Sequence, residues 1–356
     1  MKQLLPVLLI GVSFYAYAQQ DPYYTHFKDV MQAYNPAAAG NEVGKICLSG
    51  LTHHQWRDFD DNTKVRGREG DPFYADQNED ILNVAPVTYN LNVGTVFKLS
   101  KDSTKFLGAG LTIIDDKVSY IKSTTVMANL NFKMDFQGGF NQISAGIGLG
   151  GTQWGFDRPD FKSREPNDPK VPLSGGNEMK LDLNAGVMYR QQRLGPFKDF
   201  YAGLSFTNVN SPSYNVMIGQ TTVQRDFVPH TYTIVGADYH LPSGNIVLEP
   251  AMLVKYSTLL SNTEGFPAQI DLNVTALYAQ TLRGGIAFRQ FATSDAASLL
   301  IGYVKGPLQV GYAYDITLSN LQSVSNGTHE IMVKYCIPIV TKDPPPPIIR
   351  LTPRWL

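Results

Sequence analysis

The stretch from Thr124 to Phe136 reads TTVMANLNFKMDF, and apolar and polar side chains alternate along it. The apolar set occupies even positions and the polar set occupies odd positions: Val126, Ala128, Leu130, Phe132, Met134 and Phe136 against Asn129, Asn131, Lys133 and Asp135. A period of two residues is typical of a β-strand, because successive side chains of a strand point to opposite faces. This segment therefore predicts a strand with one apolar and one wet face.

The same alternation recurs along most of the chain and predicts about fourteen strands. They lie near residues 43–51, 85–99, 105–116, 119–135, 141–153, 178–192, 197–207, 227–240, 244–256, 268–279, 281–291, 296–304, 307–316 and 327–340. Most reach the ~9–11 residues that a tilted strand needs to cross a bilayer. Strands of soluble proteins average only ~5–6 residues, so the lengths favour a membrane barrel.

The connections between these strands give a second indication. Those after the first, fifth, seventh and ninth strands are long, roughly residues 52–84, 154–177, 208–226 and 257–267, whereas those after even strands are short. Short connections after the third and eleventh strands break the pattern. Long loops on one side and tight turns on the other are typical of outer-membrane barrels, with the N-terminus and the turns in the periplasm. We therefore predict an all-β fold, an outer-membrane antiparallel β-barrel of about 14 strands over residues 43–340.

A soluble periplasmic β-protein with one solvated face is the alternative fold, and it would have to cover or close every sheet edge.

The composition of the chain argues against two classes of protein, those that bind nucleic acid and those that cross a membrane with several helices. Of the 356 residues, 30 are Lys or Arg and 31 are Asp or Glu, so the net charge of −1 predicts no nucleic-acid partner. Apart from the N-terminus, no apolar run approaches the ~18 residues of a membrane-spanning helix.

The N-terminus has the pattern of an export signal. Lys2 precedes an apolar run over 4–15, and Ala16-Tyr17-Ala18 forms an A-x-A cleavage site. We expect residues 1–18 to be a cleaved signal peptide and the mature chain to reach the cell outer membrane. No Cys follows the site, so a lipid anchor is not indicated.

Two cysteines remain, Cys47 and Cys336, near the two ends of the mature chain. If the first and last strands pair, both side chains point inward at similar depth, and an oxidising compartment would permit a disulfide. The register of the barrel cannot be read from one sequence. A disulfide and two unpaired buried thiols therefore remain alternatives.

Several short motifs occur in a fixed order along the chain. Gln20-Asp21-Pro22-Tyr23-Tyr24 and Asn35-Pro36-Ala37-Ala38-Ala39-Gly40 lie near the N-terminus, and Gln55-Trp56-Arg57 follows; further matches are 248–255, 270–273, 311–315 and 329–331. Together they resemble the PorP/SprF family of type IX secretion system outer-membrane proteins of Bacteroidetes. Ala38 departs from the family pattern, in which an aromatic residue is common. The loop with Asp58, Asp60 and Asp61 is also unusually polar for the family.

The resemblance implies partners and a role rather than a reaction. It implies an outer-membrane component that acts in protein secretion and gliding motility. Its expected partner is secreted cargo, or a surface adhesin, that carries a C-terminal sorting domain. Periplasmic ring or lipoprotein components of the secretion machinery, and outer-membrane lipid, are the other implied partners. Partner contacts would involve the motif residues Gln20, Asp21, Pro22, Asn35, Pro36, Gly40, Gln55 and Trp56.

Residues 19–42 form a periplasmic N-terminal segment that is long enough to plug the barrel, and 341–356 form a periplasmic tail. The tail contains four consecutive prolines, which impose an extended spacer that cannot pair in a sheet. A frayed, solvated end is the first interpretation of this tail. A docking arm is the alternative, because four of its side chains are too apolar for a simple linker: Ile348, Ile349, Leu351 and Trp355.

No catalytic, cofactor-binding or metal-binding constellation stands out. His53 and His54 are adjacent and would point to opposite faces of a strand, and the acidic stretch 58–62 lacks the Gly and distal Glu of a calcium loop. The glycines between Gly146 and Gly151 lie inside a strand and indicate close backbone approach or curvature. We expect neither an enzyme nor a bound cofactor. A porin-like or fatty-acid-transporter-like barrel that carries a solute is the main alternative function.

Overall fold

The computed structural model describes residues 21–57, 85–99, 104–119, 121–156, 176–218, 221–242, 244–256, 268–291, 293–319, 322 and 325–339. The signal-peptide, acidic-loop and tail predictions, and with them Gln20, Ile348, Ile349, Leu351 and Trp355, lie outside these residues. The helices of the described part are single 3-10 turns, Met31–Ala33, Pro36–Ala38 and Gln137–Gly139. None of them has the length or the apolar character to cross a membrane.

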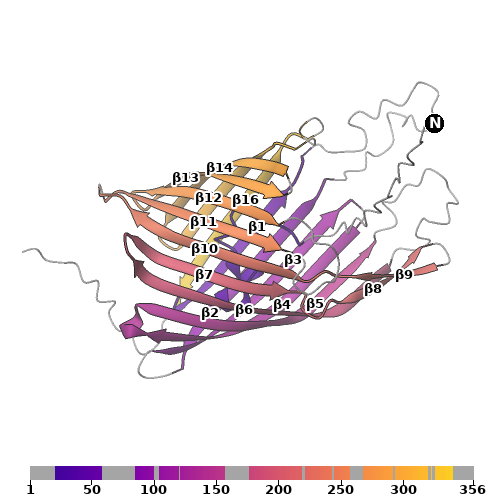
Figure 1. Ribbon diagram of the computed structural model, residues 1–356, viewed down its shortest axis with the longest axis horizontal. Coiled ribbons are helices and arrows are strands. Elements are labelled where there is room, and N and C mark those ends of the chain that lie inside the picture. Colours follow the sequence, from indigo (N-terminus) through magenta and orange to yellow (C-terminus); the bar gives the residue numbers. More distant parts are fainter. Residues whose placement is uncertain are drawn as a thin grey trace, which may run out of the picture.

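Fourteen strands form one closed antiparallel barrel (Figure 1). They are β1 (Lys45–His54), β2 (Val87–Lys98), β3 (Lys105–Val118), β4 (Ile121–Phe136), β5 (Asn141–Phe156), β6 (Gly176–Leu194), β7 (Phe197–Thr207), β10 (His230–His240), β11 (Ile246–Tyr256), β12 (Gln269–Tyr278), β13 (Leu282–Phe291), β14 (Thr293–Lys305), β15 (Leu308–Thr317) and β16 (Thr328–Pro338). Each strand pairs with its neighbour in the chain, except that β7 pairs with β10. The pairing of β1 with β16 closes the barrel and confirms the predicted fold class.

The polar side chains of the alternating strands face the lumen of the barrel, and the apolar side chains lie on its outer face. On β4, Asn129, Asn131 and Lys133 face the lumen and are 2–3% exposed, whereas Leu130 and Phe132 are 50% and 45% exposed on the outer face. An outward apolar band and a polar interior are the pattern of a membrane barrel. The same division holds on β16, where Glu330 is fully buried and Ile331 is 47% exposed.

A short hairpin was not predicted. β8 (Ser213–Ile218) and β9 (Thr221–Asp226) pair with each other within the connection between β7 and β10. An aromatic contact joins the hairpin to the barrel rim, because the ring of Tyr214 lies 5.8 Å from that of Trp154 on β5. The same ring lies 4.9 Å from that of Phe227, which directly follows β9. The Tyr214 hydroxyl also donates to the carbonyl of Thr152 at 2.8 Å. The hairpin therefore extends the long-loop end of the barrel beyond β5 and β6 (Figure 1).

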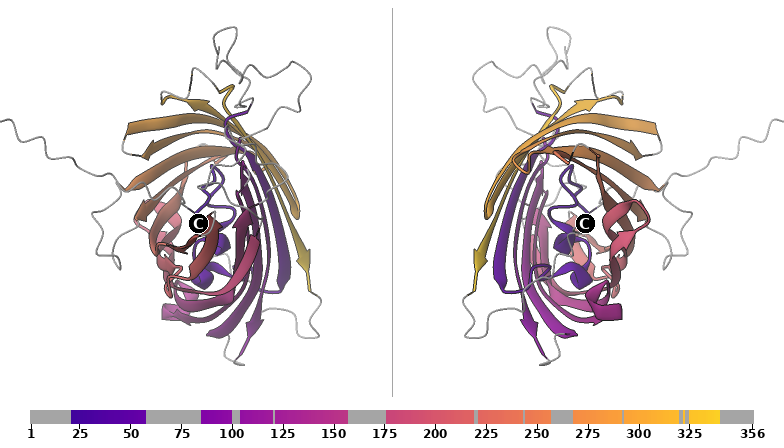
Figure 2. Two further views of the ribbon diagram at one scale, coloured as in Figure 1. Left: turned by 90° about the vertical axis from the view of Figure 1, so that its right-hand side faces the viewer. Right: turned by 90° about the vertical axis from the view of Figure 1, so that its left-hand side faces the viewer.

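The apolar core lies inside the barrel, around the segment that precedes β1. Figure 2 shows this indigo segment within the ring of strands. Its side chains pack against inward-facing residues of the wall, and the cluster includes Tyr24, Phe27, Val30, Tyr34, Ala37, Leu51, Met188, Tyr232, Leu253 and Met332. We call residues 21–42 the plug.

Candidate functional site

The plug runs from one end of the barrel to the other. Asp21 contacts Thr207, the last residue of β7, so it lies at the end that carries the long loops. Glu42 contacts Lys45 at the start of β1, so it lies at the end that carries the tight turns. The sequence predicts a periplasmic segment over residues 19–42 that is long enough to plug the barrel. In the structure residues 21–42 occupy the lumen, and the first described residue, Asp21, lies at the long-loop end.

Polar groups of β7, β10 and β11 hold Asp21 in place. Its carboxylate accepts hydrogen bonds from Thr207 at 3.0 Å, Tyr232 at 2.9 Å and Asn208 at 3.3 Å. Lys255 donates to its backbone carbonyl at 2.7 Å, and the ring of His230 lies 3.5 Å from the carboxylate. The motif residue Asp21 thus anchors the first end of the plug to the wall.

Tyr23 and Gln55 connect the plug to the rim of β1. The Gln55 side-chain amide donates to the Tyr23 hydroxyl, and the guanidinium of Arg289 stacks 3.9 Å from the centre of the Tyr23 ring. Trp56 follows at the rim, where its backbone N–H donates to the Thr328 hydroxyl at 3.1 Å. The motif residues Gln55 and Trp56 therefore lie at the junction of plug, β1 and β16.

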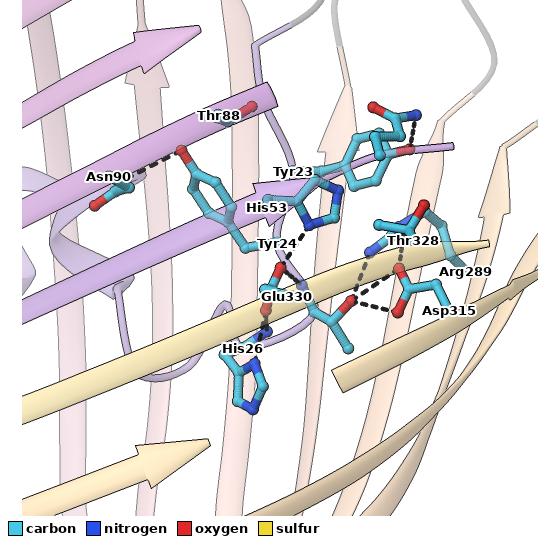
Figure 3. A network of polar contacts seen from close by, with 12 residues as sticks. Tyr23, Tyr24, His26, His53, Thr88, Asn90, Arg289, Asp315, Thr328 and Glu330 are labelled. Atoms are coloured by element: carbon cyan, nitrogen blue, oxygen red, sulfur yellow. Dashed lines mark hydrogen bonds and ion pairs between the residues drawn. The ribbon is translucent and has the colours of Figure 1, made fainter. Parts of the chain in front are cut away.

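Glu330 joins the plug to both strands of the barrel seam (Figure 3). Its two oxygens accept the backbone N–H groups of Thr25 at 2.9 Å and His26 at 2.7 Å. They also lie 2.7 Å from the Nδ1 atom of His26 and 2.8 Å from that of His53 on β1. We call Glu330, His26 and His53 the seam network. As the sequence predicts, His53 and His54 point to opposite faces of β1: His53 is buried in the lumen, where it contacts Glu330, and His54 is exposed.

The seam network changes the protonation of His26. Burial by itself lowers the pKa of His26, but the hydrogen bond to Glu330 and the negative charge of Glu330 outweigh burial and raise that pKa above its usual value. The plug therefore stabilises the imidazolium form of His26 relative to the same side chain in water.

A second buried ion network lies beside the first (Figure 3). Arg289 contacts Asp271 at 2.6 Å and Asp315 at 3.1 Å, and Asp315 accepts a hydrogen bond from the Thr25 hydroxyl at 3.0 Å. A third network lies deeper, where Lys28 of the plug contacts Glu249 at 2.6 Å and Arg283 approaches both Glu249 and Asp29. Buried charges must be paired to offset their desolvation, and these pairs connect the plug to β11, β12, β13 and β15.

The Asn35-Pro36 motif forms a turn that is hydrogen-bonded to the barrel wall. The Asn35 side-chain oxygen accepts the N–H of Ala37 at 2.9 Å and caps the 3-10 turn, while its amide donates to the carbonyl of Val187 at 3.1 Å. Asn131 of β4 donates to the carbonyls of Pro36 at 3.0 Å and Ala39 at 2.8 Å. The motif therefore satisfies backbone groups that a buried non-helical segment would otherwise leave unpaired.

Glycines make room for the plug where it touches the wall. A Cβ atom on Gly146 would lie 2.6 Å from the Ala37 nitrogen, and one on Gly40 would lie 2.0 Å from the Thr95 carbonyl oxygen. Gly40 also has a positive φ of 62°, which favours glycine. The strand glycine Gly146 thus serves close backbone approach.

The two cysteines lie opposite each other across the seam, and their sulfur atoms are bonded. The pair lies toward the tight-turn end, close to Glu42 and Lys334. Among the described residues, the one cluster of metal-ligand types is Glu42 with these two cysteines, and their sulfurs are already used in the disulfide.

Sequence reasoning included Glu249 and Glu330 in the motifs 248–255 and 329–331 but did not single out Arg289, and it gave none of the three a role in holding the plug. Glu330, Arg289 and Glu249 each lie at an inward position of an alternating strand, where a buried charge requires a partner. That signal was present in the sequence. The partners were not identifiable, because Thr25 and Glu330 are separated by 305 residues.

A family model described as "Type IX secretion system membrane protein PorP/SprF" matches residues 16–335. No curated protein matches significantly. Among solved structures, a FadL homologue of Pseudomonas aeruginosa is 10% identical over 86% of this chain and 93% of its own, with a TM-score of 0.47.

Two further barrels are similar to the same degree. The toluene transporter TodX of Pseudomonas putida is 10% identical over 89% of this chain and 93% of its own, with a TM-score of 0.45. The translocator domain of the autotransporter NalP of Neisseria meningitidis is 9% identical over 88% of this chain and 96% of its own, with a TM-score of 0.43.

Proposed function

The chain belongs to the PorP/SprF family of type IX secretion system membrane proteins, and from that membership we propose that it binds secreted cargo or a surface adhesin and links it to the periplasmic machinery. The part of the cargo that it binds is the C-terminal sorting domain. As a β-barrel of a secretion-system family, the protein is an outer-membrane component. The family match carries the proposal because it spans both the plug and the barrel.

The filled lumen supports a binding role. The plug is held by paired charges at several depths, from Asp21 at one end to Lys28 and Glu249 further in. A partner that engages this barrel therefore meets a lumen that the plug already occupies. We propose that cargo binds the long-loop end, where the β8–β9 hairpin extends the rim (Figure 1).

The opposite end is proposed to face the machinery. The tight turns and the 341–356 tail follow strands that end there, and the tail is the proposed docking arm. The motif residues Asp21, Pro22, Asn35, Pro36 and Gly40 belong to the plug, so we assign them to holding the plug and not to docking.

Affinity purification from outer membranes in mild detergent tests the proposal. The full chain and a chain that lacks 341–356 are compared, and co-purifying proteins are identified by mass spectrometry. We expect the full chain to capture a large secreted protein together with periplasmic ring or lipoprotein components. The truncated chain is expected to lose the periplasmic set and to keep the secreted protein.

The alternative function, solute transport through the lumen, makes a different prediction. A barrel that purifies alone in both forms would contradict the secretion role. Steady conductance of the full chain in a planar bilayer, with the plug intact, would favour the solute carrier.

A further inference from the structure

A cavity of about 70 Å³ lies in the lumen between the first part of the plug and the wall. It is several times larger than the ~10–15 Å³ that admits one water molecule. It lies toward the long-loop end, since Asp116 is two residues from the end of β3 and Thr207 ends β7. The lining residues that matter here are Asp21, Tyr34, Asp116, Thr152, Asp182 and Tyr232.

Two buried oxygen atoms in this lining have no hydrogen-bond partner among the described residues. Asp182 is 3% exposed; its Oδ2 atom accepts from Thr152 at 3.3 Å, and its Oδ1 atom has no partner. The hydroxyl of Tyr34, which is 5% exposed, also has no hydrogen-bond partner among the described residues. An ionised carboxylate can only accept hydrogen bonds, so whatever satisfies Asp182 must be a donor.

The charge around the cavity is negative. Asp21 is contacted by His230, and Lys255 binds its carbonyl, so its charge is partly offset. Asp116 accepts a hydrogen bond from Thr88 at 2.6 Å, and among the described residues neither it nor Asp182 forms an ion pair. The described residues that line the cavity include three acids and no Lys or Arg. A buried carboxylate without a counter-charge is costly, so the cavity favours a cation.

We propose that this cavity binds one basic side chain, Arg above Lys, of the polypeptide that docks at the long-loop end. The proposal rests on the proposed function, because it needs a polypeptide partner at that end. The three carboxylates do not form a group whose oxygens lie close enough together to share one metal ion, so they suit a ligand with separated donors. Arg presents five N–H donors in a rigid planar fork, whereas Lys presents a compact ammonium.

Calorimetric titration of the full chain in detergent at low ionic strength tests the cavity directly. The probes are N-acetyl-arginine amide, the lysine equivalent, and the citrulline equivalent, which is nearly isosteric with arginine but neutral; sodium and calcium chloride are titrated separately. We expect the arginine amide to bind, the lysine amide to bind more weakly, and the citrulline amide not to bind. Asp182→Asn is expected to weaken arginine amide binding about tenfold, the effect of one charge-assisted hydrogen bond.

The matched control is Asp115→Asn. Asp115 is the neighbour of Asp116 on β3, points to the other face of the strand and pairs with Lys122 at 3.3 Å, so its substitution should leave probe binding unchanged. If Asp182→Asn does not fold, Asp116→Asn carries the test, because its carboxylate is only partly buried. Equal binding of the citrulline and arginine amides would overturn the proposal. So would binding of sodium or calcium in place of the amides, or an equal loss in Asp115→Asn.

Capture of the secreted partner separates the two proposals. If wild type captures a secreted protein and Asp182→Asn captures it equally well, the basic-side-chain proposal fails while the proposed function stands. If wild type captures no secreted protein although the arginine amide binds, the proposed function fails and the cavity remains a cation site. Loss of both probe binding and capture in Asp182→Asn, but not in Asp115→Asn, supports both.

Discussion

Glu330 is the residue through which the plug meets the seam of the barrel. One carboxylate receives two backbone N–H groups of the plug and contacts His26 and, on β1, His53. Each hydrogen bond to a charged group contributes about 1.5–3 kcal/mol, so this residue contributes strongly to holding the plug. The contribution depends on the protonation of His26.

The first prediction concerns pH. Because the folded-state pKa of His26 is raised, its stabilising effect is complete below the unfolded-state pKa and is lost as the pH rises through the folded-state value. Hydrogen-exchange protection of the Thr25 and His26 amides, corrected for intrinsic exchange, should therefore fall from pH 6 to pH 9. His26→Gln should be less protected at pH 6 and should lose this pH dependence. Protection that rises with pH in the wild type would contradict the assignment.

The second prediction concerns Gly146, which faces the plug. Gly146→Val places side-chain atoms against the backbone of Ala37 and should displace the plug, raising planar-bilayer conductance above that of the wild type. Gly50→Val is the matched control, because a Cβ on Gly50 meets no atom within 4 Å. Folding of both is checked by heat-modifiable migration. Conductance that changes equally in the two variants would refute the role given to Gly146.

At the scale of elements, the seam between β1 and β16 is held in two ways. Backbone pairing runs from Lys45 and Pro338 to His54 and His329. The Cys47–Cys336 disulfide joins the same strands near one end, and the seam network joins them near the other. The first and last strands of the barrel are therefore linked along the length of their contact.

The third prediction tests the disulfide by alkylation. The denatured protein should take up no thiol reagent before reduction and two equivalents after reduction, measured by intact mass. Cys47→Ser should expose one thiol without reduction. Uptake of two equivalents by the unreduced wild type would show that the sulfurs are free.

Element boundaries follow from the sequence where a strand alternates cleanly. β4 and β7 lie within a few residues of the predicted 119–135 and 197–207. The β8–β9 hairpin was missed because its six-residue strands are too short to stand out in a connection expected to be a loop. Its place depends on Tyr214 packing against Trp154, which no local pattern indicates.

At the scale of the whole molecule, the two ends of the barrel differ. One end carries the long connections, the hairpin and Asp21, and the other carries the tight turns and the disulfide. Because outer-membrane barrels carry their long loops on the outer side, we expect the long-loop end of this barrel to face the cell exterior.

The fourth prediction tests that direction. An epitope inserted between β8 and β9 should be labelled by antibody on intact cells, whereas the same epitope at Gly306, in the turn between β14 and β15, should be labelled only after the outer membrane is permeabilised. Normal heat-modifiable migration of both insertions shows that the barrel has folded. The reverse labelling pattern would invert the orientation and, with it, the end proposed for cargo.

The sequence by itself determined the barrel, because each strand carries its own alternation and two environments, lipid and lumen, sort its side chains. The family motifs near the N-terminus were also readable as strings. Only the tertiary structure decided that those motifs form a plug that starts at the long-loop end, and that His26, His53 and Glu330 meet. Those contacts join residues about 300 positions apart, and they depend on strand register and barrel closure, which no local pattern encodes.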